Sequence, residues 1–594
     1  MSPSEAPALT SPYRLSAPQP QIAPTIGAAL KKLAPLLDDQ RRRLAVAFAA
    51  TAVSAIMGLQ GPRIIAHTID RDIRTRDVRG VVLSAGLLLF LYLVGLVATY
   101  VQAQQMGRVG RLLLFKLRNL LFGKLQELPL EFFNQNKAGD LISRINNDTD
   151  KLNQFFAQAL VQVSANVIVM TGAAAFMLAQ NARLGAAALA PAIVAFAFTR
   201  VTAGWVKRKN LASLQALGAL SGGVQEGLSN FRVIAAFNRA DYFERLFGEV
   251  NERNYRAATA AGIANTVLIP LYGLALTLAQ VTVLAYGFYL ITAGRLTVGL
   301  LIGFLLYLNS FYMPMRQLAA LWSSAQLAMA SLDRISAVLA LEGHLPQLPP
   351  APPAAGPALA FDHVQFSYVP GKPILRDASF AFERGKTYAL VGPTGGGKTT
   401  TALLMARLYD PQSGRVLLDG RDIRTFTPAE RATRIGFILQ EPFLFSGTVR
   451  DNVVYANEAL QPLSDDELAA RLGAKRLDAL VQRFKDGLAT PVTSAGEGLS
   501  LGQKQLVAFI RTVMREPQIL ILDEATANID TVTEQLLGEI LDELPASTTK
   551  VVIAHRLNTI ANADEILFIN MGEITRAGSM QDALDLLLHH KRES

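Results

Sequence analysis

A glycine-rich segment carries the strongest chemical signal in the sequence. It follows an apolar stretch at 387–391 with strand character and opens a segment with helical character, the context that a phosphate-binding loop requires. Glycines let successive backbone N–H groups turn toward a phosphate, and the start of a helix adds partial positive charge. We therefore expect nucleotide phosphates to be bound by Gly392, Thr394, Gly395, Gly396, Gly397, Lys398, Thr399 and Thr400.

Two side chains of this loop have the chemistry to act on the phosphates directly. The Lys398 ammonium can reach the β- and γ-phosphates, and the Thr399 hydroxyl can bind Mg²⁺. A chance glycine-rich turn would not require a Lys-Thr pair at this spacing. The loop therefore predicts ATP and Mg²⁺ as cofactors.

Two adjacent carboxylates, Asp523 and Glu524, end an apolar segment at 518–522 that is typical of a buried strand. Side chains alternate in direction along a strand, so the two carboxylates are expected to have different roles. Asp523 can hold Mg²⁺ through water, and Glu524 can polarise the water that attacks the γ-phosphate. The alternative, a carboxylate pair that only keeps a strand end soluble, is disfavoured by the phosphate loop.

The composition places these residues in a chain with a large apolar part. Of 594 residues, 51 % are hydrophobic and 18 % charged, against the ~25 % charge of typical soluble domains. The length predicts at least two folding units. Because the sequence has no cysteine, disulfides, thiolate nucleophiles, Cys-ligated zinc and iron–sulfur clusters are excluded. The net charge of +9 fits nucleic acid or, equally well, basic loops beside an anionic membrane.

Six uncharged runs predict six membrane-spanning helices. The runs are at 44–62, 81–101, 159–180, 184–199, 257–294 and 296–315. At ~1.5 Å per residue, the second run spans roughly 31 Å as a helix, which matches the hydrocarbon core. The fifth run is too long for one span, so its membrane helix is expected to start near Val267. The expected spans are 44–66, 81–103, 157–180, 184–204, 267–291 and 296–320; buried helices of a soluble bundle are the alternative.

The distribution of basic residues gives the orientation. Lysine and arginine gather between spans two and three and between spans four and five, so these connections are expected inside. The connections that hold only Arg183 and Arg295 are expected outside, while the first external loop departs from the rule with Arg63 and four further arginines. Each long inside connection is expected to be a pair of extended helices joined by a short cross-piece, with a plain solvated loop as the alternative. The bends are marked by 230–238 and by Phe132, Phe133, Gly139, Asp140, Ser143, Arg144 and Asp148.

Changes in composition divide the chain into four parts. Residues 1–27 lack the basic start and apolar run of a signal peptide and are expected to be a disordered cytosolic tail. Residues 28–340 form the predicted transmembrane domain, and six prolines within 341–357 predict a semi-rigid linker. Residues 358–594 alternate strand and helix patterns, which predicts a cytosolic α/β nucleotide-binding domain.

With the segment Leu499-Ser500-Leu501-Gly502-Gln503 between its two phosphate-related motifs, the chain resembles the ATP-binding cassette transporters. The resemblance covers nearly the whole chain after the tail and is to half of an exporter-type transporter. It implies an all-α six-helix transmembrane domain with long intracellular extensions, then an α/β phosphate-loop domain with a helical subdomain. It also implies roles for single residues: adenine stacking by Tyr368, Mg²⁺ contact by Gln440, a turn ending at Asp530, and the switch histidine His555.

The resemblance implies that two cassettes close head to tail around two ATP molecules. The signature residues Ser500, Leu501, Gly502 and Gln503 would then act on the partner's nucleotide, and hydrolysis would release the clamp and drive alternating access. Leu501 stands where glycine is usual, and the segment before the signature, 493–498, resembles a shortened form of the family's typical segment. Since heterodimeric exporters of this family often pair an altered signature with an altered catalytic site, a heterodimer with a second half-transporter is favoured over a homodimer.

Together these features predict an ATP hydrolase, with Glu524 and His555 as catalytic residues, that moves a hydrophobic or amphipathic solute, with export favoured over import. We expect a multi-pass protein of a bacterial inner membrane, in contact with lipid and not nucleic acid. An exporter-shaped importer of a siderophore or lipid-like solute shares every motif, whereas the six spans argue against a non-transport cassette ATPase. The aromatic residues that could line an apolar cavity, if they do not serve core packing or lipid contact, are Tyr92, Tyr272, Tyr286, Phe304, Tyr307 and Phe311.

Overall fold

The computed structural model describes residues 13, 15, 34–343, 345–352, 354–493, 496, 498–523, 531–553, 562–577 and 581–582. The chain forms two compact units. The first, which we call the helical unit, consists of Ser16–Gly123 and Ala138–Ala340. The second, the sheet unit, consists of Met1–Leu15, Lys124–Lys137 and Leu341–Ser594.

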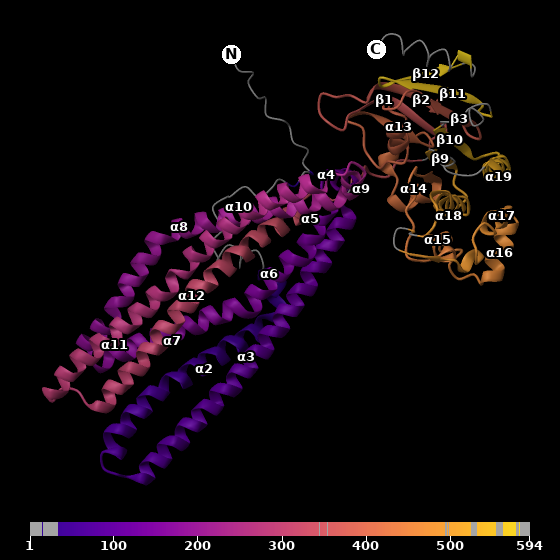
Figure 1. Cartoon of the computed structure of the whole chain (residues 1–594). Helices are drawn as coiled ribbons and strands as arrows, with labels where there is room; N and C mark the ends of the chain where they lie inside the picture. The colour runs from indigo at the N-terminus through magenta and orange to yellow at the C-terminus, as the bar shows by residue number, and fades with distance from the viewer. Residues whose placement is uncertain are drawn as a thin grey trace. The chain divides into compact units, whose positions relative to one another are not determined.

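The helical unit is built from long helices and short helical connections that lie side by side (Figure 1). In order along the chain, the elements are η1 (Asp38–Gln40), α2 (Arg41–His67), η2 (Thr68–Ile73), α3 (Val78–Glu127), α5 (Ala138–Ser143), η3 (Arg144–Asp148), α6 (Thr149–Gln154), η4 (Phe155–Ala159), α7 (Leu160–Gln180), α8 (Ala182–Ser229), α9 (Phe231–Ala236), α10 (Ala240–Thr266), α11 (Leu268–Thr292) and α12 (Val298–Leu339). Short π-helical turns interrupt the α-helical segment between Ala138 and Gln180 at two places, η3 and η4, and a third, η2, follows α2.

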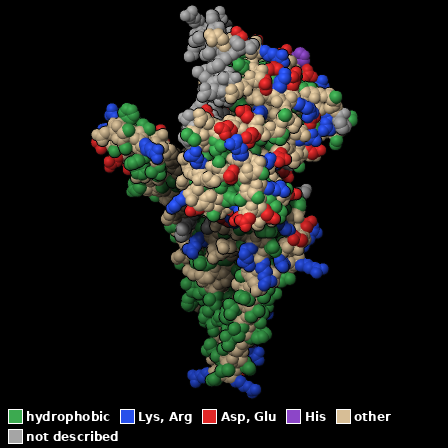
Figure 2. Space-filling model, turned by 90° about the vertical axis from the view of Figure 1, so that its right-hand side faces the viewer, with side chains coloured by type: hydrophobic (Ala, Val, Ile, Leu, Met, Phe, Trp, Pro, Cys, Tyr) green, Lys and Arg blue, Asp and Glu red, His purple; other side chains and the backbone are tan. Residues whose placement is uncertain are grey.

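Within the described residues, six helical segments are long and apolar enough to cross a membrane. They are Ala34–Ile73, Val78–Glu127, Ala138–Gln180, Ala182–Ser229, Ala240–Thr292 and Val298–Leu318. Hydrophobic side chains cover much of the helical unit's visible surface (Figure 2), and residues such as Leu89 and Phe90 on α3 are more than 60 % exposed. A soluble monomer rarely exposes so much apolar area, whereas lipid covers it. The predicted fold class is thereby confirmed for this half of the chain.

Local capping explains where two of the membrane helices begin. The Asn181 side chain accepts a hydrogen bond from the Leu184 N–H at the start of α8, and Thr297 does the same for Leu300 at the start of α12. Inside the unit, the hydroxyls of two buried tyrosines donate to backbone carbonyls of neighbouring helices: Tyr312 to Ala188 at 2.9 Å and Tyr307 to Leu59 at 2.7 Å. These bonds satisfy the polar ends of large core side chains.

The sheet unit combines two main sheets with helices. A four-stranded antiparallel sheet has the order β2-β1-β4-β5, and a six-stranded sheet has the order β12-β11-β3-β10-β9-β6. The strands are β1 (Leu359–Phe366), β2 (Leu375–Phe382), β3 (Thr387–Val391), β4 (Ser413–Leu418), β5 (Arg421–Asp422), β6 (Ile435–Ile438), β7 (Gly447–Thr448), β8 (Pro491–Val492), β9 (Ile519–Asp523), β10 (Thr549–Ile553), β11 (Glu565–Asn570) and β12 (Glu573–Ala577).

The helices of this unit form a second layer and a separate helical region (Figure 1). One core lies around the two sheets, and another lies among the helices that follow β6. The helices, with the short first cross-piece α4, are α4 (Leu130–Gln135), α13 (Lys398–Met405), η5 (Ile423–Thr425), α14 (Pro428–Arg434), α15 (Val449–Val453), α16 (Asp465–Gly473), α17 (Asp478–Val481), η6 (Gly487–Ala489), α18 (Leu501–Val513) and α19 (Thr531–Asp542).

Candidate functional site

Four parallel strands of the six-stranded sheet bring the predicted nucleotide residues to one edge. In the order β3-β10-β9-β6, Ile553 of β10 lies level with Leu390 of β3 and with Asp523 of β9. Parallel strands point their carboxyl ends to the same edge, where ligands of open α/β sheets bind. The phosphate loop follows β3, Asp523 ends β9 and Gln440 lies two residues beyond β6. Strand spacing puts β3 and β9 roughly 10 Å apart, with β10 between them.

The conformation of the phosphate loop depends on its glycines. Gly397 has φ +112°, a region that side chains rarely adopt, and a Cβ at Gly392 would lie 2.1 Å from the Ile569 carbonyl oxygen. Gly395, at φ +82°, faces open space, since a Cβ there would meet no atom within 4 Å. The loop is thus fixed against the sheet on one side and open on the other. This arrangement fits a bound phosphate.

Lys398 lies folded over this loop at the start of α13. Its side chain is buried, and its Nζ donates hydrogen bonds to the carbonyl oxygens of Gly392, at 2.9 Å, and Pro393, at 3.1 Å. Gly397 precedes α13 without a side-chain cap, which suits an anion at the positive end of the helix. Thr399 is exposed and Asp523 is 3 % exposed, so a hydroxyl and a carboxylate are both present at the sheet edge for Mg²⁺.

An aromatic cluster borders the loop. The hydroxyl of Tyr368 lies 3.2 Å from the Thr400 hydroxyl, and its ring meets Phe366 and Tyr409 edge to face at centroid distances of 4.9 and 5.2 Å. Burial raises the pKa of Tyr368, yet the residue remains 41 % exposed. The predicted base-stacking residue is therefore next to the predicted phosphate loop, although no local pattern required it.

The signature segment forms the start of α18. The Ser500 hydroxyl accepts from the Gln503 N–H at 3.2 Å, and the Gln503 side-chain oxygen accepts from the Ser500 N–H at 3.0 Å. This reciprocal capping box uses a lone pair of the Ser500 oxygen and leaves its proton for donation. Gly502 is buried, whereas Leu501 is 37 % exposed. The three other predicted residues, Glu524, Asp530 and His555, lie outside the described residues.

Sequence reasoning missed a contact between the first cross-piece and the nucleotide region. The Asn134 amide on α4 donates to the Tyr409 hydroxyl at 2.6 Å, and Leu130 packs against the core that contains Tyr409. Burial raises the pKa of Tyr409, and the bond from Asn134 partly opposes that rise. A chain of contacts therefore runs from α4 through Tyr409 and Tyr368 to the phosphate loop. The sequence held no signal for it, because 275 positions separate the two hydrogen-bonded residues.

A second missed feature is a cluster of charges within the helical unit. Arg334 on α12 lies 2.7 Å from the Asp140 carboxylate and 3.1 Å from that of Asp148. Arg144 pairs with Asp140 at 2.9 Å and donates to the Arg334 carbonyl oxygen, while Ser331 donates to Asp148 at 3.0 Å. Three of these residues were expected only to mark a bend. The cluster instead ties that bend to the last long helix.

A phosphate loop and a strand-end carboxylate on one sheet edge, in one chain with six membrane-length helices, define a membrane-bound nucleotide-driven protein. Two family models match: the ABC transporter transmembrane region over residues 44–315 and the ABC transporter model over residues 375–527. An uncharacterised ABC transporter ATP-binding protein of Bacillus subtilis is 33 % identical over 93 % of this chain and 92 % of its own length.

Two further relatives have descriptive names. A fatty acid ABC transporter ATP-binding/permease protein of Mycobacterium bovis is 32 % identical over 86 % of this chain and 80 % of its own. A multidrug resistance ABC transporter ATP-binding and permease protein of Lactococcus lactis subsp. cremoris is 29 % identical over 90 % and 89 %. The chain belongs to the ATP-binding cassette transporter family, as an exporter-type, ATP-hydrolysing, multi-pass bacterial membrane protein. The alternative of a non-transport ATPase is thereby set aside.

Proposed function

We propose that this protein couples ATP hydrolysis to the export of a hydrophobic or amphipathic solute. The observation that supports this most directly is the convergence of the phosphate loop, Asp523 and Gln440 on one sheet edge in a chain with six membrane-length helices. In this proposal Lys398 and the loop N–H groups hold the phosphates, and Tyr368 stacks on the adenine. Glu524 and His555 complete the catalytic set.

Mg²⁺ belongs to the same proposal. Thr399, Gln440 and Asp523 supply a hydroxyl, an amide and a carboxylate oxygen at the sheet edge, and oxygen is the ligand atom that Mg²⁺ prefers. When bound, the ion neutralises charge on the β- and γ-phosphates. Because Asp523 is only 3 % exposed, its carboxylate is held in place by the protein and is suited to orient a water molecule or the ion.

The partner is proposed to be a second half-transporter. The second cross-piece α9 presents Phe231 and Val233, which are 64 % and 55 % exposed. The sheet unit has a groove lined by Phe443, Phe445 and Tyr455, each more than 40 % exposed. We propose that α9 of one subunit occupies this groove on the other, which removes both apolar surfaces from water. Ser500 and its neighbours would then face the partner's nucleotide.

The exposed Leu501 side chain at the signature favours a heterodimer over a homodimer, because it would crowd a phosphate where glycine leaves room. Since the chain has no cysteine, Val233→Cys and Phe443→Cys form a clean cross-linking pair. An intersubunit disulfide in the chain purified alone, with two equivalent hydrolysing sites, would reject the heterodimer. Cross-linking only after a second half-transporter is added supports it.

Export and substrate class rest on the apolar character of the helical unit, and the names of the fatty acid and multidrug relatives agree with an amphipathic solute. The alternative of an exporter-shaped importer differs only in direction. ATP-dependent uptake of a labelled amphiphile into inside-out vesicles tests this, because an exporter accumulates the solute in them and an importer does not. Glu524→Gln should abolish accumulation while ATP binding persists, and Glu458→Gln, an exposed glutamate of the same unit, is the control. Unchanged accumulation with Glu524→Gln would refute the assignment of the base.

A further inference from the structure

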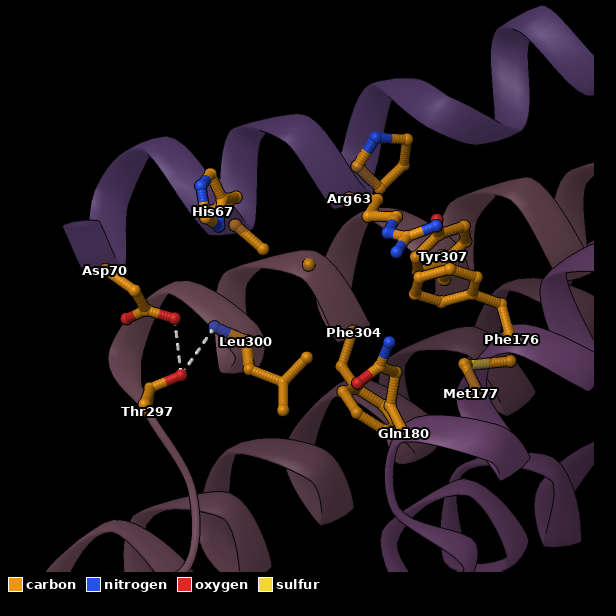
Figure 3. Close-up of a pocket in the computed structure, with 13 residues that line it drawn as sticks. Arg63, His67, Asp70, Phe176, Met177, Gln180, Thr297, Leu300, Phe304 and Tyr307 are labelled. Carbon is orange, nitrogen blue, oxygen red and sulfur yellow. Dashed lines mark hydrogen bonds between the residues drawn. The ribbon is translucent and has the colours of Figure 1, made fainter. Parts of the chain in front are cut away.

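A cavity of about 250 Å³ lies within the helical unit, between α2, α7 and α12. It is close to the turns that precede α3 and α12, at the end expected outside. Figure 3 shows the Arg63 side chain beside Phe176 and Tyr307, with the amide of Gln180 pointing into the same space. Its walls include the apolar side chains of Met177, Leu300 and Phe304. It is therefore an apolar space with polar groups at defined positions, as ligand sites are.

The two charged residues that line this cavity, Asp70 and Arg63, differ in their interactions with the protein. Asp70 is engaged at the start of α12, where its carboxylate accepts hydrogen bonds from the Thr297 hydroxyl and, at 2.8 Å, from the Gly299 N–H. Arg63 has no ion pair within the described part of the chain, and its guanidinium lies 5.9 Å from the centroid of the Phe176 ring. His67 lies one helical turn from Arg63 on the same helix. The space beside Arg63 thus offers positive charge and hydrogen-bond donors, whereas the Asp70 carboxylate lies seven residues away, roughly 10 Å along the helix at ~1.5 Å per residue.

Arg63 lies inside the ends of the membrane helices that flank it. Phe176 lies four residues before the end of α7, and Tyr307 nine residues after the start of α12, so Arg63 lies roughly 6–14 Å inside the helix ends at ~1.5 Å per residue. In the single chain the Arg63 side chain is exposed, and its cation–π contact with Phe176 leaves its positive charge without a counter-ion. An ionisable residue in such a position is expected to serve a function.

Close helix packing holds the cavity in shape. A Cβ at Gly299 would lie 2.2 Å from the Ala66 carbonyl oxygen, and one at Gly303 would lie 3.2 Å from the Ala66 side chain. Two glycines four residues apart thus let α12 approach α2 closely, as small residues do in membrane bundles. Tyr307 adds a fixed wall, because its hydroxyl is held by the Leu59 carbonyl oxygen.

We infer that this cavity binds the anionic head of an amphiphilic solute, an inference that rests on the proposed transport function and names its substrate class. Arg63 contacts the charged head, His67 and Gln180 donate hydrogen bonds to it, and Met177, Leu300 and Phe304 contact the first carbons of the tail. A cationic head beside Arg63 would be repelled by the guanidinium, because the Asp70 carboxylate lies about two helical turns away. A neutral head would leave the Arg63 charge unpaired.

The test is photolabelling of protein in phosphatidylcholine nanodiscs with a diazirine analogue of oleic acid, measured without ATP by mass spectrometry of peptides from α2 and α12. Oleate should compete at a concentration at least tenfold below that of oleyl alcohol or oleylamine. In Arg63→Gln this difference should disappear, in Arg63→Lys it should persist, and in Arg183→Gln, an exposed outer arginine that does not line the cavity, it should match wild type.

Equal competition by oleate and oleyl alcohol in the wild-type protein would overturn the inference. This measurement does not depend on whether any variant folds. Unchanged oleate selectivity in Arg63→Gln would overturn it as well. An anionic head can come from a bilayer lipid or from a free amphiphile, and nanodiscs with one third phosphatidylglycerol distinguish the two. Competition by that lipid assigns the site to bilayer headgroups, and no competition assigns it to a free amphiphile. ATP hydrolysis by the same preparations tests the transport proposal separately, since the labelling does not depend on it.

Discussion

Replacing Arg334 by methionine should destabilise the helical unit strongly. Arg334 is the main cationic partner of Asp148, whose side chain is 1 % exposed, while Lys151 lies 3.6 Å from that carboxylate and is 44 % exposed. Removing one partner of a buried ion pair typically costs about 3–5 kcal/mol, because the other charge stays buried and uncompensated. Arg334 itself is 26 % exposed, so we expect the lower end, about 3 kcal/mol.

This loss corresponds to about two orders of magnitude in the unfolding equilibrium constant. At roughly 2–4 °C per kcal/mol for a large domain, the melting temperature of the purified protein should fall by about 6–12 °C. The measurement is thermal unfolding in detergent, with aggregation followed in parallel. Arg316→Met, which removes an exposed arginine from the same helix, should shift the melting temperature by no more than about 2 °C.

A double variant separates loss of the ion pair from loss of the arginine stem. Asp148→Leu with Arg334→Met removes both charges, so it should recover part of the stability lost in Arg334→Met alone. The reasoning is refuted if Arg334→Met melts within about 2 °C of wild type, or if the double variant is less stable than the sum of the two single changes.

Three further predictions concern the sheet unit. Asn134→Ala should lower the solute moved per ATP hydrolysed by roughly two- to tenfold, the worth of one neutral hydrogen bond; unchanged coupling in vesicles, or an equal effect of Asn147→Ala, would contradict the contact chain from α4. Lys398→Ala should weaken ATP binding at least tenfold by calorimetry while Lys372→Ala does not, and equal affinities would count against the phosphate-loop assignment. The hydrogen bond and charge of Asp377 raise the pKa of His363, so this pair stabilises the fold below the ordinary histidine pKa and loses its effect as pH rises through the raised value. The difference in melting temperature between wild type and Asp377→Asn should therefore be larger at pH 5.5 than at pH 8.5; a pH-independent difference argues against the pair.

The sequence alone was enough for the features that local composition controls. Uncharged runs of membrane length predict six spans because lipid excludes charge whatever the partners of a helix are. The segment from Gly392 to Thr400 predicts a phosphate loop because its glycines, its lysine and the following helix act within a few residues of one another. The fold class and the family follow from these local signals.

The tertiary structure decided which distant residues meet. Asn134 and Tyr409, or Arg334 and Asp148, are ordinary polar residues in the sequence, and their importance comes from burial beside each other. Arg63 looked like an exception to the charge pattern of an external loop, yet in the fold it faces a cavity made by three helices. Periodicity and motif spacing report on neighbours along the chain, whereas the cost of burying a polar or charged group depends on partners that only the packed helices and strands bring within reach.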